Sequence, residues 1–237
     1  MGTTGYVILS RQTGLMREMQ VVANNIANAA TTGYRQQGLI FSEYVSASPD
    51  QSSVSMGRAQ IYNTSMGQGN LTQTNGDFDL AVEGDGFFML ETPSGNRLTR
   101  AGSFAPNAVG DLVNMSGYRV LDAGGAPVFV PTGVGGVKVA SDGTLSAEGQ
   151  PIGQIGLFQP GDTTLLVRED GVMFRAEGDV NPADSAKILQ GFLEASNVNP
   201  IGQVARMIEI QRAYEMGQSF LEAEDERIRN SVKSLMR

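Results

Sequence analysis

The chain has 237 residues, enough for one domain with a sizeable core together with long appendages. Its 17 basic and 25 acidic residues give a net charge of −8, which disfavours nucleic acid as a partner because gripping phosphates requires clustered Lys and Arg. The chain has no His and no Cys, which removes the commonest general base, thiol nucleophiles and thiolate metal sites. We therefore expect no catalytic residue, no cofactor and no bound metal.

The sequence carries no recognisable export or membrane signal. Its start lacks a basic segment followed by an apolar run, so we expect no cleaved signal peptide. No run of about 18 or more apolar residues occurs, so we expect no membrane insertion.

Charge and composition divide the chain into parts. Residues 1–75 carry 4 basic and 3 acidic side chains, residues 76–187 carry 7 and 15, and residues 188–237 carry 6 and 7. The net negative charge therefore lies in the middle, and the near-neutral ends are suited to contact with copies of one another. We expect an N-terminal helix in residues 1–34, an extended connector in 35–75, a central β domain in 76–187 and a C-terminal helix in 188–237.

The N-terminal part predicts a helix from about Thr4 to Thr32. Spacings of four and three residues select a stripe typical of a coiled coil or helix bundle, and six of its seven members are apolar: Ile8, Gln12, Leu15, Met19, Val22, Ile26 and Ala29. Gly33 can adopt the left-handed conformation that commonly ends a helix, so we expect the helix to stop there.

Two different patterns follow this helix. Residues 35–75 are rich in Ser, Gln, Asn, Thr and Gly, which predicts an extended or partly disordered connector that orders only when packed. From residue 76 to about 184, short apolar runs alternate with turn signals, as in an all-β domain, and Asp85-Gly86, Asp142-Gly143 and Asp170-Gly171 are expected as hairpin-type turns. The expected strands are Phe78–Val82, Gly86–Glu91, Arg97–Arg100, Asp111–Asn114, Tyr118–Leu121, Val128–Val130, Val137–Val139, Gln154–Phe158, Thr164–Arg168 and Val172–Arg175.

The C-terminal part predicts a longer helix of about 36 residues, with Asn199 as its N-cap and Pro200 at its first position. One series at seven-residue spacing is apolar throughout: Met207, Tyr214, Leu221, Ile228 and Leu235. Its expected partner series is mixed: Val204, Gln211, Gln218, Asp225 and Val232. We expect this helix to pair with the N-terminal helix as a coiled coil. The predicted fold class is therefore α+β, mainly β, with paired terminal helices and a central all-β domain.

The run from Ala23 to Tyr34 holds three Asn residues, Asn24, Asn25 and Asn28, where a heptad helix should be strong. One interpretation is a frayed helix end. The other is a contact surface, in which small Ala side chains allow close approach and Asn amides supply donors and acceptors. The residues alone leave both open.

This run resembles the N-terminal motif of the bacterial flagellar rod and hook family, A-N-N-[IL]-A-N-x-x-T-x-G-[FY], at every defined position. The central pattern is similar too, in Leu80–Phe88, Leu98–Phe104, Gly110–Leu112 and Gly117–Leu121. So is the C-terminal pattern, in Leu193–Val198, Met207-Ile208 and Gln211–Glu215. Asn199, Gln203 and Gly217 depart from residues common in the family. Within it, the length and the opening residues are most similar to the proximal rod member.

The resemblance implies a structural subunit of the basal-body rod in the periplasm, part of the drive shaft that carries torque from motor to hook. It implies as partners other copies of the chain, inner rod subunits below, distal rod subunits above and the flagellar type III export apparatus. The residues it marks as assembly contacts are Ile8, Leu15, Val22, Asn24, Asn25, Ile26, Asn28, Gly33, Ser196, Asn197, Val198, Met207, Gln211, Arg212, Tyr214, Glu215, Leu221 and Ile228. Arg212 and Glu215 are expected to pair across the helical core.

Three alternatives stay open from the sequence. A distal rod or hook-type subunit of the same family fits nearly as well. An acidic carbohydrate-active β protein would use a pair of carboxylates, although no pair is singled out. A calcium-binding adhesin module is weaker, because Val82 occupies the position that a calcium loop beginning at Asp77 reserves for Gly.

Overall fold

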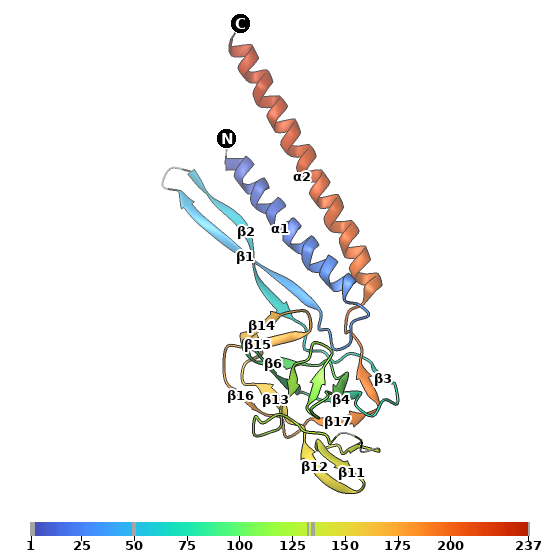
Figure 1. The fold of residues 1–237 in the computed structure, drawn as a ribbon. Helices are drawn as coiled ribbons and strands as arrows, with labels where there is room; N and C mark the ends of the chain where they lie inside the picture. The colour runs from blue at the N-terminus through green and yellow to red at the C-terminus, as the bar shows by residue number, and fades with distance from the viewer. Residues whose placement is uncertain (1–2, 49–50, 132, 134–135, 237) are drawn as a thin grey trace. The chain divides into compact units, whose positions relative to one another are not determined.

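The computed structural model describes residues 3–48, 51–131, 133 and 136–236. The chain has an α+β fold that is mostly antiparallel β and divides into two compact units. The helical unit comprises Met1–Ala27, Gln37–Ser65 and Asn199–Arg237, and the sheet unit comprises Asn28–Gln36 and Met66–Val198. The ribbon in Figure 1 shows the elements of each unit along the chain.

The C-terminal helix α2 spans Pro200–Leu235 and has the 36 residues expected from the sequence. The Asn199 side chain accepts a hydrogen bond from the Gly202 N–H at 3.1 Å, and Pro200 occupies the first turn, where its missing N–H is not needed. The predicted start of this helix is confirmed, although residues 187–194 before it form strands.

The N-terminal helix α1 spans Thr3–Ala27, so the expected end at Gly33 is wrong. The chain leaves the helix at Asn28, where the Thr31 N–H donates to the Asn28 carbonyl in a turn. Asn residues favour such turns over the helix interior, which explains the earlier end.

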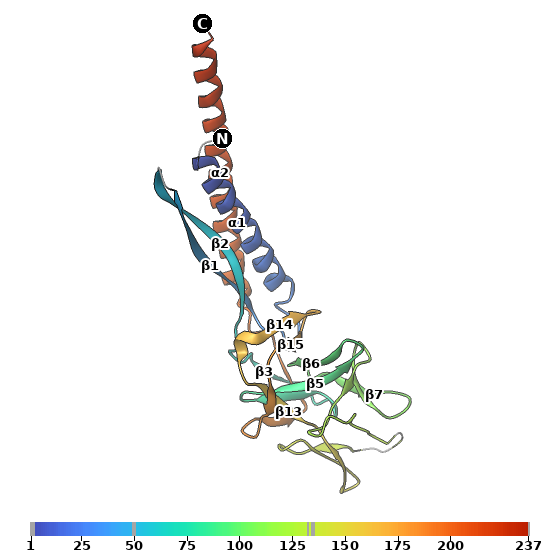
Figure 2. The same ribbon diagram turned by 90° about the vertical axis from the view of Figure 1, so that its left-hand side faces the viewer.

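Two antiparallel strands, β1 (Gln37–Ser48) and β2 (Gln51–Thr64), form a hairpin within the segment expected to be a connector. Gln37 pairs with Thr64 at the base of the hairpin. The turned view in Figure 2 also shows the hairpin running alongside α1 within the helical unit.

The sheet unit is built on a nine-stranded antiparallel sheet. Seven of its strands follow the order β14-β15-β6-β5-β9-β8-β7, and the other two are β13, which pairs with β5, and β16, which pairs with β13. These strands are β5 (Phe87–Thr92), β6 (Gly95–Thr99), β7 (Phe104–Pro106), β8 (Leu112–Asn114), β9 (Arg119–Val120), β13 (Leu157–Pro160), β14 (Leu166–Glu169), β15 (Met173–Ala176) and β16 (Val180–Pro182). A short 3-10 helix, η1 (Thr163–Leu165), precedes β14.

Three smaller sheets complete the unit. They pair β17 with β4, β18 with β3, and β10 with β11 and β12. Their strands are β3 (Leu71–Gln73), β4 (Leu80–Glu83), β10 (Lys138–Val139), β11 (Thr144–Ala147), β12 (Gln150–Gln154), β17 (Lys187–Gln190) and β18 (Phe192–Glu194).

Strand β5 lies between the two apolar clusters of the sheet unit. Successive side chains of a strand point to opposite faces, and both faces of β5 are buried. Phe88 and Leu90 join the larger apolar cluster, whereas Phe87 and Met89 join the smaller one. Each cluster contains an edge-to-face aromatic pair, of which Phe88 and Phe104 have ring centroids 5.1 Å apart.

Two of the three expected hairpin turns are confirmed. Asp142-Gly143 joins β10 to β11, and Asp170-Gly171 joins β14 to β15 with positive φ at both residues. Asp85-Gly86 is not a hairpin turn, because it joins β4 to β5 and these strands pair with other partners. Within the described residues, neither helix is long and apolar enough to cross a membrane.

Candidate assembly surface

The two long helices pack against each other in antiparallel directions within the helical unit (Figure 1). At one end the Asn25 amide donates to the Gln203 side-chain oxygen at 3.2 Å. Farther along, Glu18 forms an ion pair with Arg206, and Gln12 faces Gly217. Because the helices are antiparallel and Gln12 faces Gly217, the start of α1 at Thr3 lies alongside about residue 226 of α2.

The face of α2 that is shielded from solvent follows two series at seven-residue spacing. The expected series is present in Met207, Tyr214 and Leu221, each partly buried. The second series is displaced by one residue from the expected one. It consists of Gln203, Ile210, Gly217 and Glu224, whereas Val204, Gln211, Gln218 and Asp225 are exposed. Ile210, which the sequence pattern missed, is the buried residue of the helix, at 2% exposure.

The matching face of α1 carries apolar residues of the stripe that the sequence predicts for this helix. Val22 is buried at 4% exposure, and Ile8, Leu15 and Ile26 are partly buried. The structure thus places these four side chains on the more shielded side of α1.

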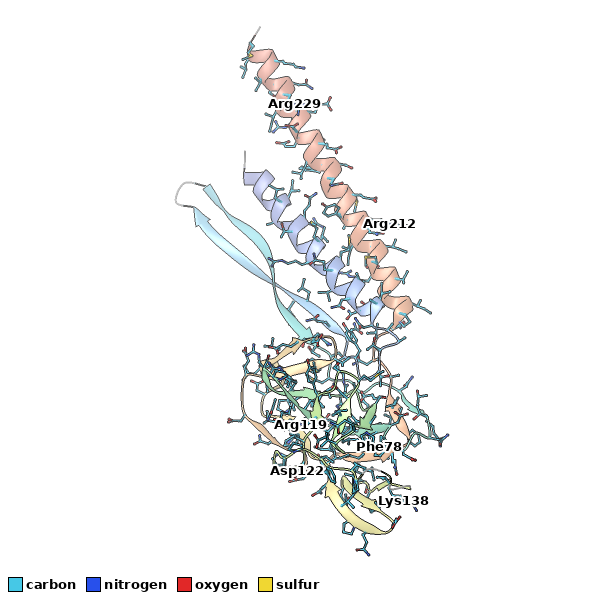
Figure 3. All side chains as sticks on the ribbon, in the orientation of Figure 1. Phe78, Arg119, Asp122, Lys138, Arg212 and Arg229 are labelled. Atoms are coloured by element: carbon cyan, nitrogen blue, oxygen red, sulfur yellow. The ribbon has the colours of Figure 1, made fainter. Side chains whose placement is uncertain are left out.

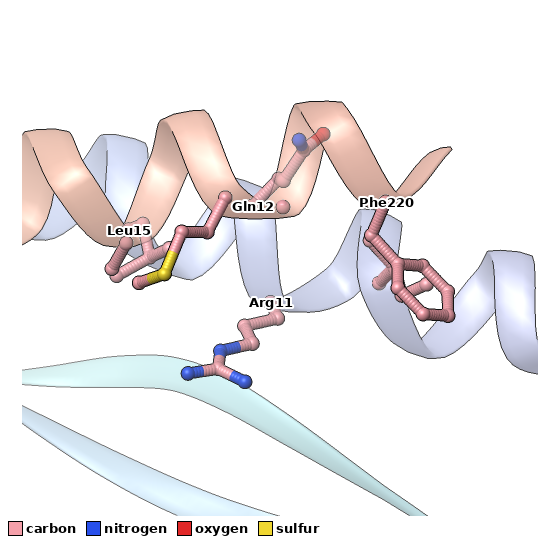
Figure 4. A pocket seen from close by; sticks show the side chains of 8 residues that line it. Arg11, Gln12, Leu15 and Phe220 are labelled. Carbon is pink, nitrogen blue, oxygen red and sulfur yellow. The ribbon is translucent and has the colours of Figure 1, made fainter. Parts of the chain in front are cut away.

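An apolar groove of about 380 Å³ lies between the two helices (Figure 4). Its lining residues are Ile8, Arg11, Gln12, Leu15, Ala213, Met216, Gly217 and Phe220. Met216 and Phe220 are 67% and 52% exposed, so the groove presents large apolar side chains to solvent. Arg11 extends from α1 toward the β1–β2 hairpin.

The end of α2 extends beyond the start of α1, as both ribbon views show. In this segment, residues 227–235, Ile228 and Val232 are more than two-fifths exposed and Leu235 is 86% exposed. Figure 3 shows Arg229 projecting from the same stretch. Ile228 and Leu235 continue the series of Met207, Tyr214 and Leu221 past the point where α1 covers it.

A second apolar face lies near the start of α2, away from the shielded series. It is formed by Ile201, Val204 and Ile208, all exposed. Arg212 lies on the side of α2 away from α1 (Figure 3), and Glu215 is also exposed. The expected pairing of Arg212 with Glu215 across the core is wrong, since no ion pair joins them among the described residues.

The expected Asn contacts differ from one residue to the next. Asn25 is buried at 1% exposure and is used within the chain, where its amide donates to the Gln37 carbonyl and accepts from the Gln37 N–H at 2.8 and 2.9 Å. These bonds fix the base of the hairpin to α1. Asn24 is exposed, and Asn28 is partly buried and accepts from the Thr31 hydroxyl.

Gly33 has a role other than ending the helix. Its φ is +70°, and a Cβ there would lie 2.3 Å from the Ala101 nitrogen, so only glycine fits. Its N–H donates to the Glu194 carbonyl at 2.7 Å. Gly33 therefore lets the segment after α1 pack directly against the backbone at Ala101, within the sheet unit.

The segment that follows Gly33 is held by aromatic and charged contacts. The Arg168 guanidinium lies over the rings of Tyr34 and Phe174, at 4.5 and 4.8 Å from their centroids, and also donates to the Arg35 carbonyl. Tyr34 is 1% exposed, and burial raises the pKa of its phenol.

Three buried charges meet beside this segment. The Glu194 carboxylate contacts the guanidinium of Arg35 at 3.0 Å and that of Arg100 at 3.1 Å, and the three side chains are at most 3% exposed. Burial, and then the positive charge of Arg35, lower the pKa of Arg100 to about 10. Burial also lowers the pKa of Arg35. A pKa of about 10 leaves Arg100 charged at neutral pH.

The residues just before α2 complete this region. The Asn197 side chain accepts from the Gln36 N–H at 2.6 Å and donates to the Gly67 carbonyl at 2.7 Å. The Ser196 hydroxyl accepts from the Val198 N–H, and Val198 is buried. We refer to Tyr34, Arg35, Gly67, Gly69, Arg100, Glu194 and Asn197 as the junction cluster. Arg35 was not singled out in the sequence, where it lies between Tyr34 and Gln36 and no local pattern indicates a buried partner.

The chain is 39% identical to the flagellar basal-body rod protein FlgF of Mesorhizobium japonicum, over 89% of this chain and 88% of that protein. It belongs to the flagellar basal-body rod protein family. It is also 38% identical to FlgF of Caulobacter vibrioides, over 97% and 96% of the two chains. Similarity to the rod protein FlgG of Bacillus subtilis is lower, at 29% identity over 96% and 97%.

Three family profiles match successive parts of the chain. Residues 3–35 match the flagella basal body rod protein profile, residues 81–147 match the D1 domain of flagellar hook protein FlgE/F/G, and residues 189–233 match the C-terminal profile of rod FlgEFG proteins. A member of this family is a structural component of the basal-body rod, to which we therefore assign the chain. The expected family is confirmed. The profiles of the two ends cover α1, nearly all of α2, and Tyr34, Arg35, Glu194 and Asn197 of the junction cluster.

Proposed function

We propose that the chain forms the proximal part of the flagellar rod and carries torque from the motor toward the hook. The observation that supports this position within the rod is the higher identity to FlgF, at 38–39%, than to FlgG, at 29%, over comparable shares of the chains. Its neighbours in the rod would be inner rod subunits below and distal rod subunits above. Its role is structural and needs no catalytic group.

Assembly proceeds through the terminal helices. Within one subunit α1 and α2 form a short coiled-coil pair, and the apolar side chains that this pair leaves exposed are covered by the helices of neighbouring subunits. Burying one such side chain fully contributes about 1.5–3 kcal/mol, so several per subunit stabilise an assembly while leaving the monomer soluble. The groove and the end of α2 are the surfaces that support this proposal.

Export precedes assembly. We infer that the chain passes unfolded through the flagellar type III apparatus, since it has no cysteine that must be paired. The helices, which bury little apolar surface in the monomer, complete their packing only in the rod.

Electron microscopy of basal bodies from a strain lacking the gene tests the function, with swimming measured alongside. The proposal predicts basal bodies that stop before the rod reaches the outer membrane, and immunolabelling of the complemented strain at the motor-side half of the rod. Label on the hook-side half would assign the chain to the distal rod. Complete rods with a missing hook, or normal swimming, would contradict the proposal.

A further inference from the structure

The chain passes between the helical unit and the sheet unit four times, at residues 27/28, 36/37, 65/66 and 198/199. Any torque that the backbone carries from one unit to the other passes through these four segments. Four single backbone segments would bend and twist independently unless something joined them close to the crossings.

The junction cluster joins them within the sheet unit. Arg35 lies just before the second crossing, and its guanidinium donates to the carbonyls of Met66 and Gly67, just after the third. Asn197, just before the fourth, bridges Gln36 and Gly67. Side chains from two segments thus hold the backbone of the third.

Glu194 is the common partner of these ties. Its carboxylate accepts from Arg35, from Arg100 and from the Gly69 N–H, which come from three separate parts of the chain. Its carbonyl accepts from the Gly33 N–H, close to the first crossing. A Cβ at Gly69 would lie 1.9 Å from the Ala195 carbonyl oxygen, so the two segments are in close backbone contact.

The charge balance makes this partner hard to replace. Two guanidinium groups share one carboxylate in a site from which water is almost wholly excluded. Arg100 also donates to the carbonyls of Val82 and Gly84, which anchors the cluster to strand β4 of the sheet unit. Without the carboxylate, two buried cations would lie side by side, with Asp85 as a weaker counter-charge that makes no ion pair with either of them among the described residues.

We propose that Glu194 is the positioning residue that couples the four crossing segments to the sheet unit, so that torque passes through a buried ion cluster in addition to the backbone. The torque in this inference rests on the proposed function, whereas the coupling of the segments can be measured on the purified protein. The apolar clusters of the sheet unit do not include Glu194, so we expect the strands to stay packed when its charge is removed.

Glu169 supplies a matched control. Its carboxylate also binds two arginines, Arg97 at 2.6 Å and Arg175 at 2.7 Å, but it lies on β14, is about one-third exposed and joins strands of a single sheet. Glu169→Gln and Glu194→Gln therefore remove the same chemical group from two carboxylates that each bind two arginines, one at the junction and one away from it.

Site-resolved amide hydrogen exchange on the purified full chain tests the proposal. In Glu194→Gln, we expect exchange of the Gly33, Gly69 and Asn197 amides to accelerate at least about 10-fold, with the Leu112 and Leu121 amides of the sheet changed less than about 3-fold. Glu169→Gln should leave the junction amides unchanged, and Glu194→Asp, which keeps the charge, should restore part of the protection. Equal acceleration of junction and sheet amides, or none, would overturn the proposal.

A second variant tests the ties without disturbing a buried charge. Asn197→Ala removes the acceptor of the Gln36 N–H, so the Gln36 amide should exchange faster while Gly69, held by Glu194, stays protected. Unchanged exchange at Gln36 would contradict the assignment. Since these measurements use the monomer, their failure would leave the rod assignment intact, and a failed rod assignment would leave the coupling measurable.

Discussion

The sheet unit and the helical unit differ in how far they bury their apolar side chains. In the sheet unit Leu80, Phe88, Leu90 and Leu112 are fully buried in one chain. Among all residues of α2, each of which the structure describes, Ile210 alone is buried. The sheet unit closes its core by itself, whereas the helices keep apolar surface available, as expected of a part that is completed by neighbours.

The largest effect is expected where the sheet unit is closed. Phe88→Ala removes a fully buried ring that packs edge-to-face on Phe104, and should cost about 3–5 kcal/mol of unfolding free energy. Thermal or denaturant unfolding followed by near-ultraviolet circular dichroism measures this loss. A cost below about 1 kcal/mol would mean that this core is not closed as described.

A change in α2 should separate its inner face from its outer face. Ile210→Asp places a charge on the buried position and should cost about 3 kcal/mol, seen as loss of helix signal from the monomer while the sheet core still melts cooperatively. Ile208→Asp, at a 44% exposed position, is the control and should leave the monomer within about 0.5 kcal/mol. Equal effects of the two variants would contradict the helix packing.

Gly33→Ala tests the close approach of the segment after α1 to the sheet. At φ +70° an alanine costs roughly 1–2 kcal/mol in any surrounding, and here its Cβ also meets the Ala101 backbone. Gly171 is the control, with φ +72° and no described atom within 4 Å of an added Cβ. Chemical denaturation should show a larger loss for Gly33→Ala than for Gly171→Ala, and equal losses would remove the proposed contact.

The smallest effect concerns pH. The Arg175 hydrogen bond, and then that of Arg97, hold the pKa of the partly exposed Glu169 carboxyl below its ordinary value of 4.5. A depressed native pKa stabilises the fold above the unfolded value, so this contribution is present above about pH 4.5 and is lost as pH falls through the native pKa. Glu169→Gln should reduce the slope of unfolding free energy against pH below about pH 4.5. An unchanged slope would show that the pairing contributes nothing in solution.

Much of the α2 structure was predictable, because its N-cap, its first-turn Pro and its apolar periodicity are all local signals. The partner series was displaced by one residue for a physical reason. Val204 is apolar but faces outward, and periodicity does not distinguish a face covered within the chain from one left exposed. The early end of α1 was missed because the Asn-rich run carries two competing signals, helix and turn.

The junction cluster was beyond sequence reasoning. Arg35, Arg100 and Glu194 are far apart in the chain, and each alone resembles a surface charge. Arg100 and Glu194 lay inside the motifs that indicated the family, but the motif gave no reason for their charge. Their burial follows only once the strands place three segments together.

Photo-crosslinking in swimming cells tests the central claim most directly. A photoreactive amino acid replaces either Ile228, 44% exposed on the end of α2, or Met115, 95% exposed in the sheet unit. The account predicts abundant adducts from position 228, joining this chain to another copy or to another rod protein, and few from position 115 despite its greater exposure. Abundant adducts from position 115 with none from position 228 would contradict assembly through the terminal helices.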